Sequence, residues 1–212
     1  MIGSQTIETW TNNLASKAPV PGGGGASALA GALAAALGQM VANLTVGKKR
    51  YADVEEKMRQ SLAALDILQQ ELLALADKDA EVFAPLAAAY ALPAQTEEEK
   101  AKKAAVMEER LLDASLVPLQ IMEKSFEVLD ILQLLGQKGS RMAVSDAGVG
   151  AQMARAAMTG AVMNVYINTK SMKNREKADE INRKADKLLE KSTKLADEIY
   201  AAVTAVLREG NT

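Results

Sequence analysis

Residues 18–47 contain no charged side chain, and this stretch constrains the fold more than any other feature of the chain. It opens with prolines and glycines, continues as an alanine-rich run from Ala26 to Thr45, and is followed by Lys48. The stretch is long enough to cross a membrane. Its prolines, glycines and alanines, however, give little driving force for insertion. We therefore interpret it as a helix buried at the centre of a protein, with no membrane contact.

The rest of the chain favours helices as well. Hydrophobic residues make up 49% of the sequence but aromatic residues only 3%, so alanine and leucine, both strong helix formers, dominate. From Val54 to Val82, and again from Ile181 to Val206, small or apolar residues recur at alternating spacings of four and three, as on one face of a helix. The sequence predicts an all-α, up-and-down bundle of about six helices forming a single domain over residues 1–212.

Local signals place the ends of these helices. Six helices are expected, over about residues 4–16, 26–45, 53–85 or beyond, 96–136, 145–172 and 174–209. Side-chain N-caps are expected at Ser4, Ser145 and Asn174, and a capping box at Thr96 and Glu99. Pro85 should kink or end the third helix, Pro118 should kink the fourth, and Gly136 and Gly139 should end it.

Composition excludes several classes of function. The chain has no cysteine, which excludes disulfides, thiolate nucleophiles and cysteine-based zinc sites. It has no histidine, so proton transfer must use Asp, Glu, Lys or Tyr with a shifted pKa. A net charge of −2 gives no basic field that would attract nucleic acid. Because the chain does not open on a signal-peptide pattern, we expect a cytoplasmic protein.

The segment from Pro19 to Gly25 is the first candidate for a site. Consecutive glycines at the start of a helix let backbone N–H groups approach an anion at the positive end of the helix dipole. The spacing matches neither a P-loop nor a dinucleotide fingerprint. A flexible turn that only changes the chain direction is the alternative. Lys48, the first charge after the neutral stretch, could bind an anion or merely compensate the helix dipole.

Asp79 is the most informative single residue. It occupies a position that the spacing of its helix reserves for apolar side chains, so its carboxylate is either paired and structural or partly desolvated with a raised pKa. The second state suits general acid–base catalysis. Asn164 and Asn168 lie four residues apart in an uncharged stretch and suggest a polar pocket. Asn43 could pair with protein or ligand groups, and Asp146 could simply cap its helix.

Several blocks of the sequence resemble the cyclodeaminase/cyclohydrolase domain of the formiminotransferase-cyclodeaminase family. The specific block is Ser16–Gly24 continued by Gly31–Leu33 and Met40–Thr45, and supporting blocks are Asp79–Phe83, Leu92–Pro93, Ser145–Asp146 and Asn164–Asn168. The resemblance spans almost the whole chain but includes no formiminotransferase domain. It therefore leaves the physiological substrate open.

The resemblance implies an all-helical homodimer acting on tetrahydrofolate derivatives, free or polyglutamylated. The implied activity is 5,10-methenyltetrahydrofolate cyclohydrolase, 5-formiminotetrahydrofolate cyclodeaminase, or both, and the second would connect the chain to histidine degradation. Asp79 matches the catalytic aspartate of the family. Pocket residues implied by the match are Pro21, Gly22, Gly23, Gly24, Asn43, Lys48, Asp146, Asn164 and Asn168. No metal and no cofactor beyond the folate is expected. The alternative is a non-enzymatic helical scaffold that dimerises through small-residue faces.

Overall fold

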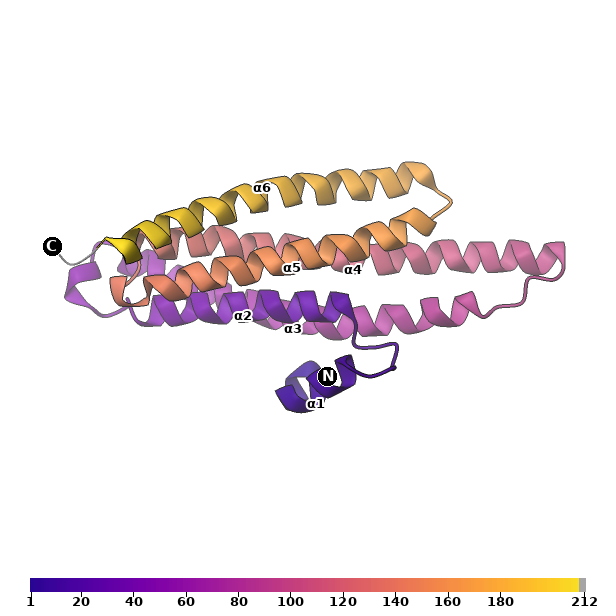
Figure 1. Ribbon diagram of the computed structural model, residues 1–212, viewed down its shortest axis with the longest axis horizontal. Coiled ribbons are helices and arrows are strands. Elements are labelled where there is room, and N and C mark those ends of the chain that lie inside the picture. The colour runs from indigo at the N-terminus through magenta and orange to yellow at the C-terminus, as the bar shows by residue number, and fades with distance from the viewer. Residues whose placement is uncertain (210–212) are drawn as a thin grey trace.

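The computed structural model describes residues 1–209 and confirms the all-α fold (Figure 1). The helices are α1 (Ile7–Leu14), α2 (Gly23–Asn43), α3 (Glu55–Tyr90), α4 (Glu97–Lys138), α5 (Val144–Ser171) and α6 (Arg175–Arg208). Short 3-10 turns lie at Ile2–Ser4, Lys49–Tyr51 and Arg141–Ala143. Within the described residues there is no strand.

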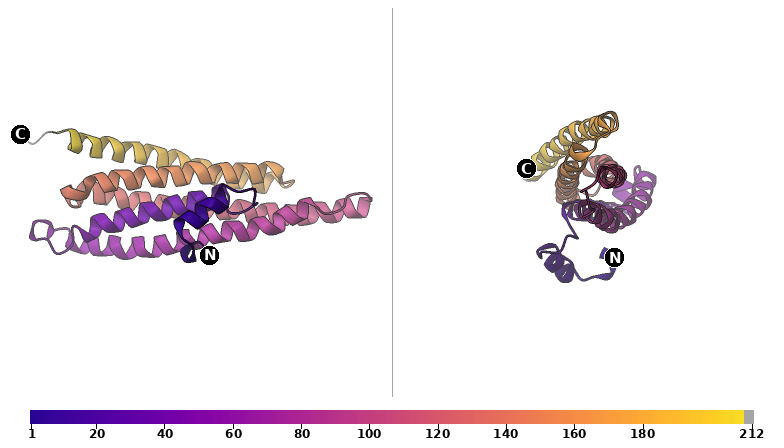
Figure 2. Two further views of the ribbon diagram at one scale, coloured as in Figure 1. Left: turned by 60° about the horizontal axis from the view of Figure 1, so that its bottom comes forward. Right: turned by 90° about the vertical axis from the view of Figure 1, so that its right-hand side faces the viewer.

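Four helices form the body of the bundle, in an up-and-down order. α2 and α4 each pack against both α3 and α5, and α2 also touches α4 across the centre. α6 covers α4 and α5 from outside, and α1 lies outside the long helices with its Trp10 buried in the core (Figure 2). Because α2 and α5 run in opposite directions, the start of α2 lies beside the last turns of α5.

Small residues allow this close packing. Most of the inward face of α2 is Gly or Ala, and a methyl group added at Gly150 of α5 would lie 3.4 Å from the carbonyl oxygen of Ala34. α2 is the one helix among residues 1–209 that is long and apolar enough to span a membrane by length and composition. Of its most apolar window, 56% is buried against the other helices, so packing in the core accounts for its composition.

Several predicted helix ends are confirmed. Thr96 and Glu99 form the capping box of α4: the Thr96 hydroxyl accepts the Glu99 N–H, and the Glu99 carboxylate accepts the Thr96 N–H. The Asn174 side chain accepts the Lys177 N–H at the start of α6. Gly139 follows the last residue of α4. These signals are local in sequence, which is why they predict well.

Other predicted ends are wrong. The cap of α1 is Thr6 and not Ser4, because the Ser4 hydroxyl instead donates to the Met1 carbonyl in a preceding 3-10 turn. Ser145 does not cap α5, which already begins at Val144 as a continuation of the Arg141–Ala143 turn. Gly136 lies inside α4.

Proline and glycine positions supply the other corrections. α3 continues through Pro85 to Tyr90; Pro85 is exposed, so water can satisfy the backbone carbonyl that it frees. α2 begins at Gly23, three residues earlier than predicted, because three glycines form its first turn. That first turn lies against α3 at Asp79.

Candidate functional site

The glycine turn and Asp79 are in direct contact. The backbone N–H of Gly25 donates to Asp79 Oδ2 over 2.9 Å. A methyl group added at Gly24 would collide with the Asp79 carboxylate, whereas one added at Gly22 would meet nothing within 4 Å. The N-terminal turn of α2 therefore binds a carboxylate from α3, and the absence of a side chain at Gly24 lets that carboxylate approach the backbone.

Asp79 is half-buried, and its environment favours the neutral acid. Burial raises the pKa of its carboxyl, and the hydrogen bond from the Gly25 N–H opposes this by stabilising the charged form. Burial is the larger of the two effects. Between the two alternatives left by the sequence, this geometry favours a partly desolvated carboxyl with a raised pKa over a salt-bridged structural one.

Asn164 reaches the same turn from α5. A methyl group added at Gly23 would lie 3.5 Å from Asn164 Nδ2, so Asn164 and Asp79 flank consecutive glycines from two different helices. Asn164 Nδ2 donates to the carbonyl of Gly160 in its own helix. Pro21 packs at this turn too, with its Cβ 3.8 Å from where a methyl group at Gly25 would lie. We call this group, Asp79, Gly23–Gly25 and Asn164, the glycine-end site.

Asn168 lies one turn further along α5. Its Nδ2 donates to the carbonyl of Ala114 in α4 over 2.7 Å, and the side chain is partly exposed. This hydrogen bond ties the last turns of α5 to α4. One N–H of the amide is thus already bonded to the protein, and the role of Asn168 in binding stays a prediction.

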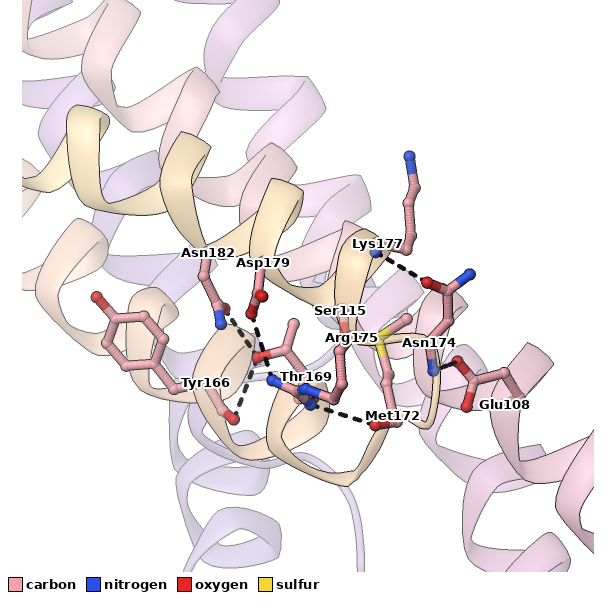
Figure 3. A network of polar contacts seen from close by, with 10 residues as sticks. All are labelled: Glu108, Ser115, Tyr166, Thr169, Met172, Asn174, Arg175, Lys177, Asp179 and Asn182. Carbon is pink, nitrogen blue, oxygen red and sulfur yellow. Dashed lines mark hydrogen bonds and ion pairs between the residues drawn. The ribbon is translucent and has the colours of Figure 1, made fainter.

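The end of α5 is held in place by a polar network at the turn into α6 (Figure 3). The Thr169 hydroxyl donates to Asn182, and the Arg175 guanidinium donates to the carbonyls of Thr169 and Met172. The Glu108 carboxylate on α4 accepts the backbone N–H groups of residues 173 and 174. These hydrogen bonds fix the end of α5 against α4 and α6, and they thereby fix the position of Asn164 beside α2.

Tyr166 belongs to this network and not to the glycine-end site. Its hydroxyl donates to Asp186 on α6 over 2.5 Å. Burial, followed by this hydrogen bond to a carboxylate, raises the pKa of Tyr166 to about 12. A tyrosine that holds its proton this firmly is a poor acid near neutral pH, which leaves Asp79 as the better proton-transfer group.

Three residues predicted for the same pocket lie at the other end of the helical bundle. Asn43 ends α2, Lys48 follows it, and Asp146 lies in the first turn of α5, beside that end of the bundle. α2 has 21 residues, which places its two ends about 30 Å apart. One copy of the chain therefore does not bring these residues to Asp79.

The far end of α2 has a polar network of its own, which sequence analysis missed. The buried Thr45 hydroxyl accepts the Ser140 N–H over 2.8 Å, and the Lys48 ammonium lies 3.4 Å from the Ser140 hydroxyl. The Arg141 N–H donates to the Tyr51 hydroxyl, which lowers the pKa of Tyr51. No sequence spacing connects these residues, since Ser140 is 95 positions from Thr45.

A basic cavity of about 290 Å³ adjoins this network. Arg50, Lys138 and Arg141 line it together with Asp53. We call it the basic cavity. Three cations against one carboxylate favour an anionic occupant. Within residues 1–209, no group of three or more carboxylates is arranged to hold a metal ion.

Comparisons of the sequence and of the structure with known proteins find relatives of the same kind. The family model described as "Formiminotransferase-cyclodeaminase" matches residues 6–187. A methenyltetrahydrofolate cyclohydrolase of Methylorubrum extorquens is 42% identical over 203 residues, 96% of this chain and 98% of its own. The formimidoyltransferase-cyclodeaminase of Gallus gallus is 33% identical over 83% of this chain, which spans 32% of that protein. A crystal structure of a formiminotetrahydrofolate cyclodeaminase from Thermotoga maritima superposes with a TM-score of 0.81 at 27% identity, covering 98% of both chains.

Proposed function

Because the chain belongs to the formiminotransferase-cyclodeaminase family, we propose that it is a folate-dependent one-carbon enzyme that hydrolyses 5,10-methenyltetrahydrofolate to 10-formyltetrahydrofolate. The relative that it matches over its full length carries the name of this activity. The observation that carries the proposal is the desolvated Asp79 carboxyl held against the glycine turn. A non-enzymatic scaffold has no need of such a group.

Asp79 supplies the proton transfers of the proposed reaction. Ionised Asp79 accepts a proton as water attacks the carbon that bridges N5 and N10, which gives a tetrahedral intermediate. The bond from this carbon to N5 then breaks, Asp79 returns its proton to N5, and the formyl group remains on N10. The hydroxyl proton of the intermediate is released to solvent. A carboxyl whose pKa is raised towards neutrality is a stronger base than an ordinary aspartate.

The neighbouring groups orient the substrate in this proposal. The Asn164 amide lies beside Gly23 and can meet the donor and acceptor edge of the pterin, with Asn168 one turn beyond it. Proton transfer and hydrolysis change no oxidation state, so the proposed reaction requires no redox cofactor, and we propose that it proceeds without a metal.

Replacement of Asp79 by asparagine tests the assignment. Asn keeps the size of the side chain but cannot take up a proton, so kcat should fall by about 10² to 10⁴. The loss of near-ultraviolet absorbance of methenyltetrahydrofolate follows the reaction. Asp66→Asn, at an exposed position of the same helix, is the matched control and should keep full activity. Unchanged turnover in a folded D79N protein would end the assignment.

Cyclodeaminase activity is the second candidate, favoured by the Thermotoga maritima structure. There Asp79 would enter protonated and assist the departure of ammonia from the same tetrahedral carbon. Supplying methenyltetrahydrofolate and formiminotetrahydrofolate separately, and measuring absorbance and released ammonia, distinguishes the two activities. Ammonia release as the faster reaction would replace the first proposal by the second and would support a role in histidine degradation.

We further propose that the chain acts as a homodimer. α2 and α5 expose apolar side chains on the surface: Leu33, Met40, Val149, Met163 and Ile167. Such an uncharged surface on two neighbouring helices favours a second copy of the chain as its partner. If two copies pack antiparallel, the far end of one α2 lies near the glycine end of the other. Lys48 and the basic cavity of one copy then face the glutamate tail, single or multiple, of a folate bound at Asp79 of the other.

Complementation between inactive variants tests this sharing. Asp79→Asn and Lys48→Ala are each expected to weaken activity in homodimers. In a mixed dimer with a shared site, one site carries both substitutions and the other carries neither, so about half of the wild-type activity per mixed dimer returns. If each site belongs to one chain, mixing restores nothing. A monomer in solution would overturn the dimer itself.

A further inference from the structure

Phe83 lies one helical turn beyond Asp79 on α3. Residues four apart on a helix share a face and have Cβ atoms about 5–6 Å apart. Ala76, seven residues before Phe83, lies on this face too, and the first turn of α2 covers it there: a methyl group at Gly25 would lie 3.4 Å from the Ala76 carbonyl oxygen. Phe83 thus occupies the inward face of α3 just beyond the start of α2.

The side chain of Phe83 is nevertheless 38% exposed. The reason is visible in Figure 1, where α3 and α4 run on past the first turn of α2. Leu72, on the same face but beside α2, is fully buried. The other phenylalanine of the chain, Phe126, packs against the core. Phe83 therefore offers a partly exposed aromatic side chain one helical turn from Asp79.

We propose that Phe83 stacks on the p-aminobenzoyl ring of the folate substrate. The inference rests on the proposed function, in which Asp79 acts on the carbon between N5 and N10. N10 is bonded directly to the p-aminobenzoyl ring, so a substrate with its bridge at Asp79 brings this ring within about 7 Å of a residue one turn away. Aromatic rings pair in offset or edge-to-face geometry at such distances.

The position of Asn164 favours the p-aminobenzoyl ring over the pterin. Asn164 approaches Gly23 from α5, whereas Phe83 approaches from α3, so the two residues meet the substrate from different helices. The pterin has the hydrogen-bonding edge that an amide recognises, and the p-aminobenzoyl ring offers mainly its π-face. Phe83 is in this assignment a binding residue that positions the bridge at Asp79 and takes no part in proton transfer.

Substitution of Phe83 should separate binding from turnover. Phe83→Ala is expected to raise KM for methenyltetrahydrofolate about tenfold while kcat stays within about threefold. Phe83→Leu, which keeps apolar volume without the ring and guards against misfolding, should behave similarly, and Phe83→Tyr should restore KM. The control is Ile67→Ala, at a 60% exposed apolar position of the same helix, which should change neither constant.

Fragments of the substrate identify the ring. In Phe83→Ala, competitive inhibition by p-aminobenzoylglutamate should weaken about tenfold, and inhibition by a tetrahydropterin without the benzoyl group should not change. If inhibition by the tetrahydropterin weakened and inhibition by p-aminobenzoylglutamate did not, the assignment would be overturned. An unchanged KM in both Phe83→Ala and Phe83→Leu, with the wild type active, would overturn it and leave the proposed function intact. A wild type that neither converts nor binds folates would overturn both.

Discussion

The two ends of α2 use polar groups in opposite ways. At the glycine end, a half-buried carboxyl from α3 receives a hydrogen bond from the Gly25 N–H, and burial raises the pKa of Asp79. At the far end, the fully buried Thr45 hydroxyl donates to the Val41 carbonyl and accepts the Ser140 N–H. The first arrangement leaves an ionisable group poorly solvated, and the second satisfies a neutral group completely.

Because of this difference, the polar groups at one end of α2 are suited to catalysis, and those at the other end stabilise the fold. A buried neutral hydroxyl with both hydrogen bonds made stabilises the fold, and its loss leaves a partner unpaired. A partly desolvated carboxyl costs folding free energy when it ionises, but the same cost makes it a better proton acceptor. We therefore expect substitutions at the glycine end to change turnover more than stability, and substitutions at the far end to do the reverse.

Among substitutions that leave Asp79 itself in place, Gly24→Ala is expected to give the largest effect. The added methyl group would collide with the flexible end of the Asp79 side chain, which can move aside without unfolding the helix. A displacement of about 1 Å in a catalytic group can cost about 10² in rate, so kcat should fall by that order while the melting temperature stays close to that of the wild type. Steady-state kinetics and calorimetry measure the two quantities.

Gly22→Ala is the matched control for this substitution. The family resemblance implies Gly22 as a pocket residue, but Gly22 lies outside the glycine-end site. It has extended backbone, and a methyl group there meets nothing within 4 Å, so kcat should not change. Equal losses in the two variants would mean that flexibility of the glycine turn matters, and not its approach to Asp79.

Thr45→Val should give the next largest effect, on stability. Valine keeps the shape of threonine but leaves the Ser140 N–H without its partner, which costs about 1–3 kcal/mol. Chemical denaturation measures the change. Thr159→Val on α5 is the control, since the Thr159 hydroxyl donates to carbonyls of its own helix and accepts no hydrogen bond from residues 1–209. If Thr45→Val lowered kcat as strongly as it lowers stability, the two ends of α2 would not differ in function as we propose.

Much of this arrangement follows from the sequence, because its signals are local. The alternating spacing predicts the long helices, and the Thr96–Glu99 pair predicts the start of α4. Asp79 stands out because it interrupts an apolar pattern. These inferences need only residues a few positions apart.

The remaining features depend on distant contacts or on side chains that are absent. A glycine run contains no cap or periodicity, so the start of α2 could not be placed, and Gly24 meets a residue 55 positions away. Phe83 shows its exposure only once α2 is seen to begin at Gly23. The distance from Gly23 to Lys48, in contrast, follows from helix rise alone, and sequence analysis should have separated those residues.

The pH dependence of stability should show the smallest effect, and its sign distinguishes the two ends. Burial raises the pKa of Asp79 in the folded state, so the folded protein binds this proton more tightly than the unfolded chain does. The resulting stabilisation is fully present below the ordinary aspartate pKa of about 3.9 and is lost as pH rises through the raised folded-state pKa. Asparagine has no proton to lose.

The free energy of unfolding of Asp79→Asn should therefore increase relative to that of the wild type as pH rises from about 4 through the raised folded-state pKa of Asp79. Urea unfolding at a series of pH values measures this difference. Thr45→Val removes no ionisable group, so its difference from the wild type should be flat across the same range. A flat difference for Asp79→Asn would mean that the Gly25 hydrogen bond cancels the effect of burial on the pKa, and a difference that decreases with pH would mean that it outweighs burial. Asp79 would then belong with the satisfied polar groups of the far end.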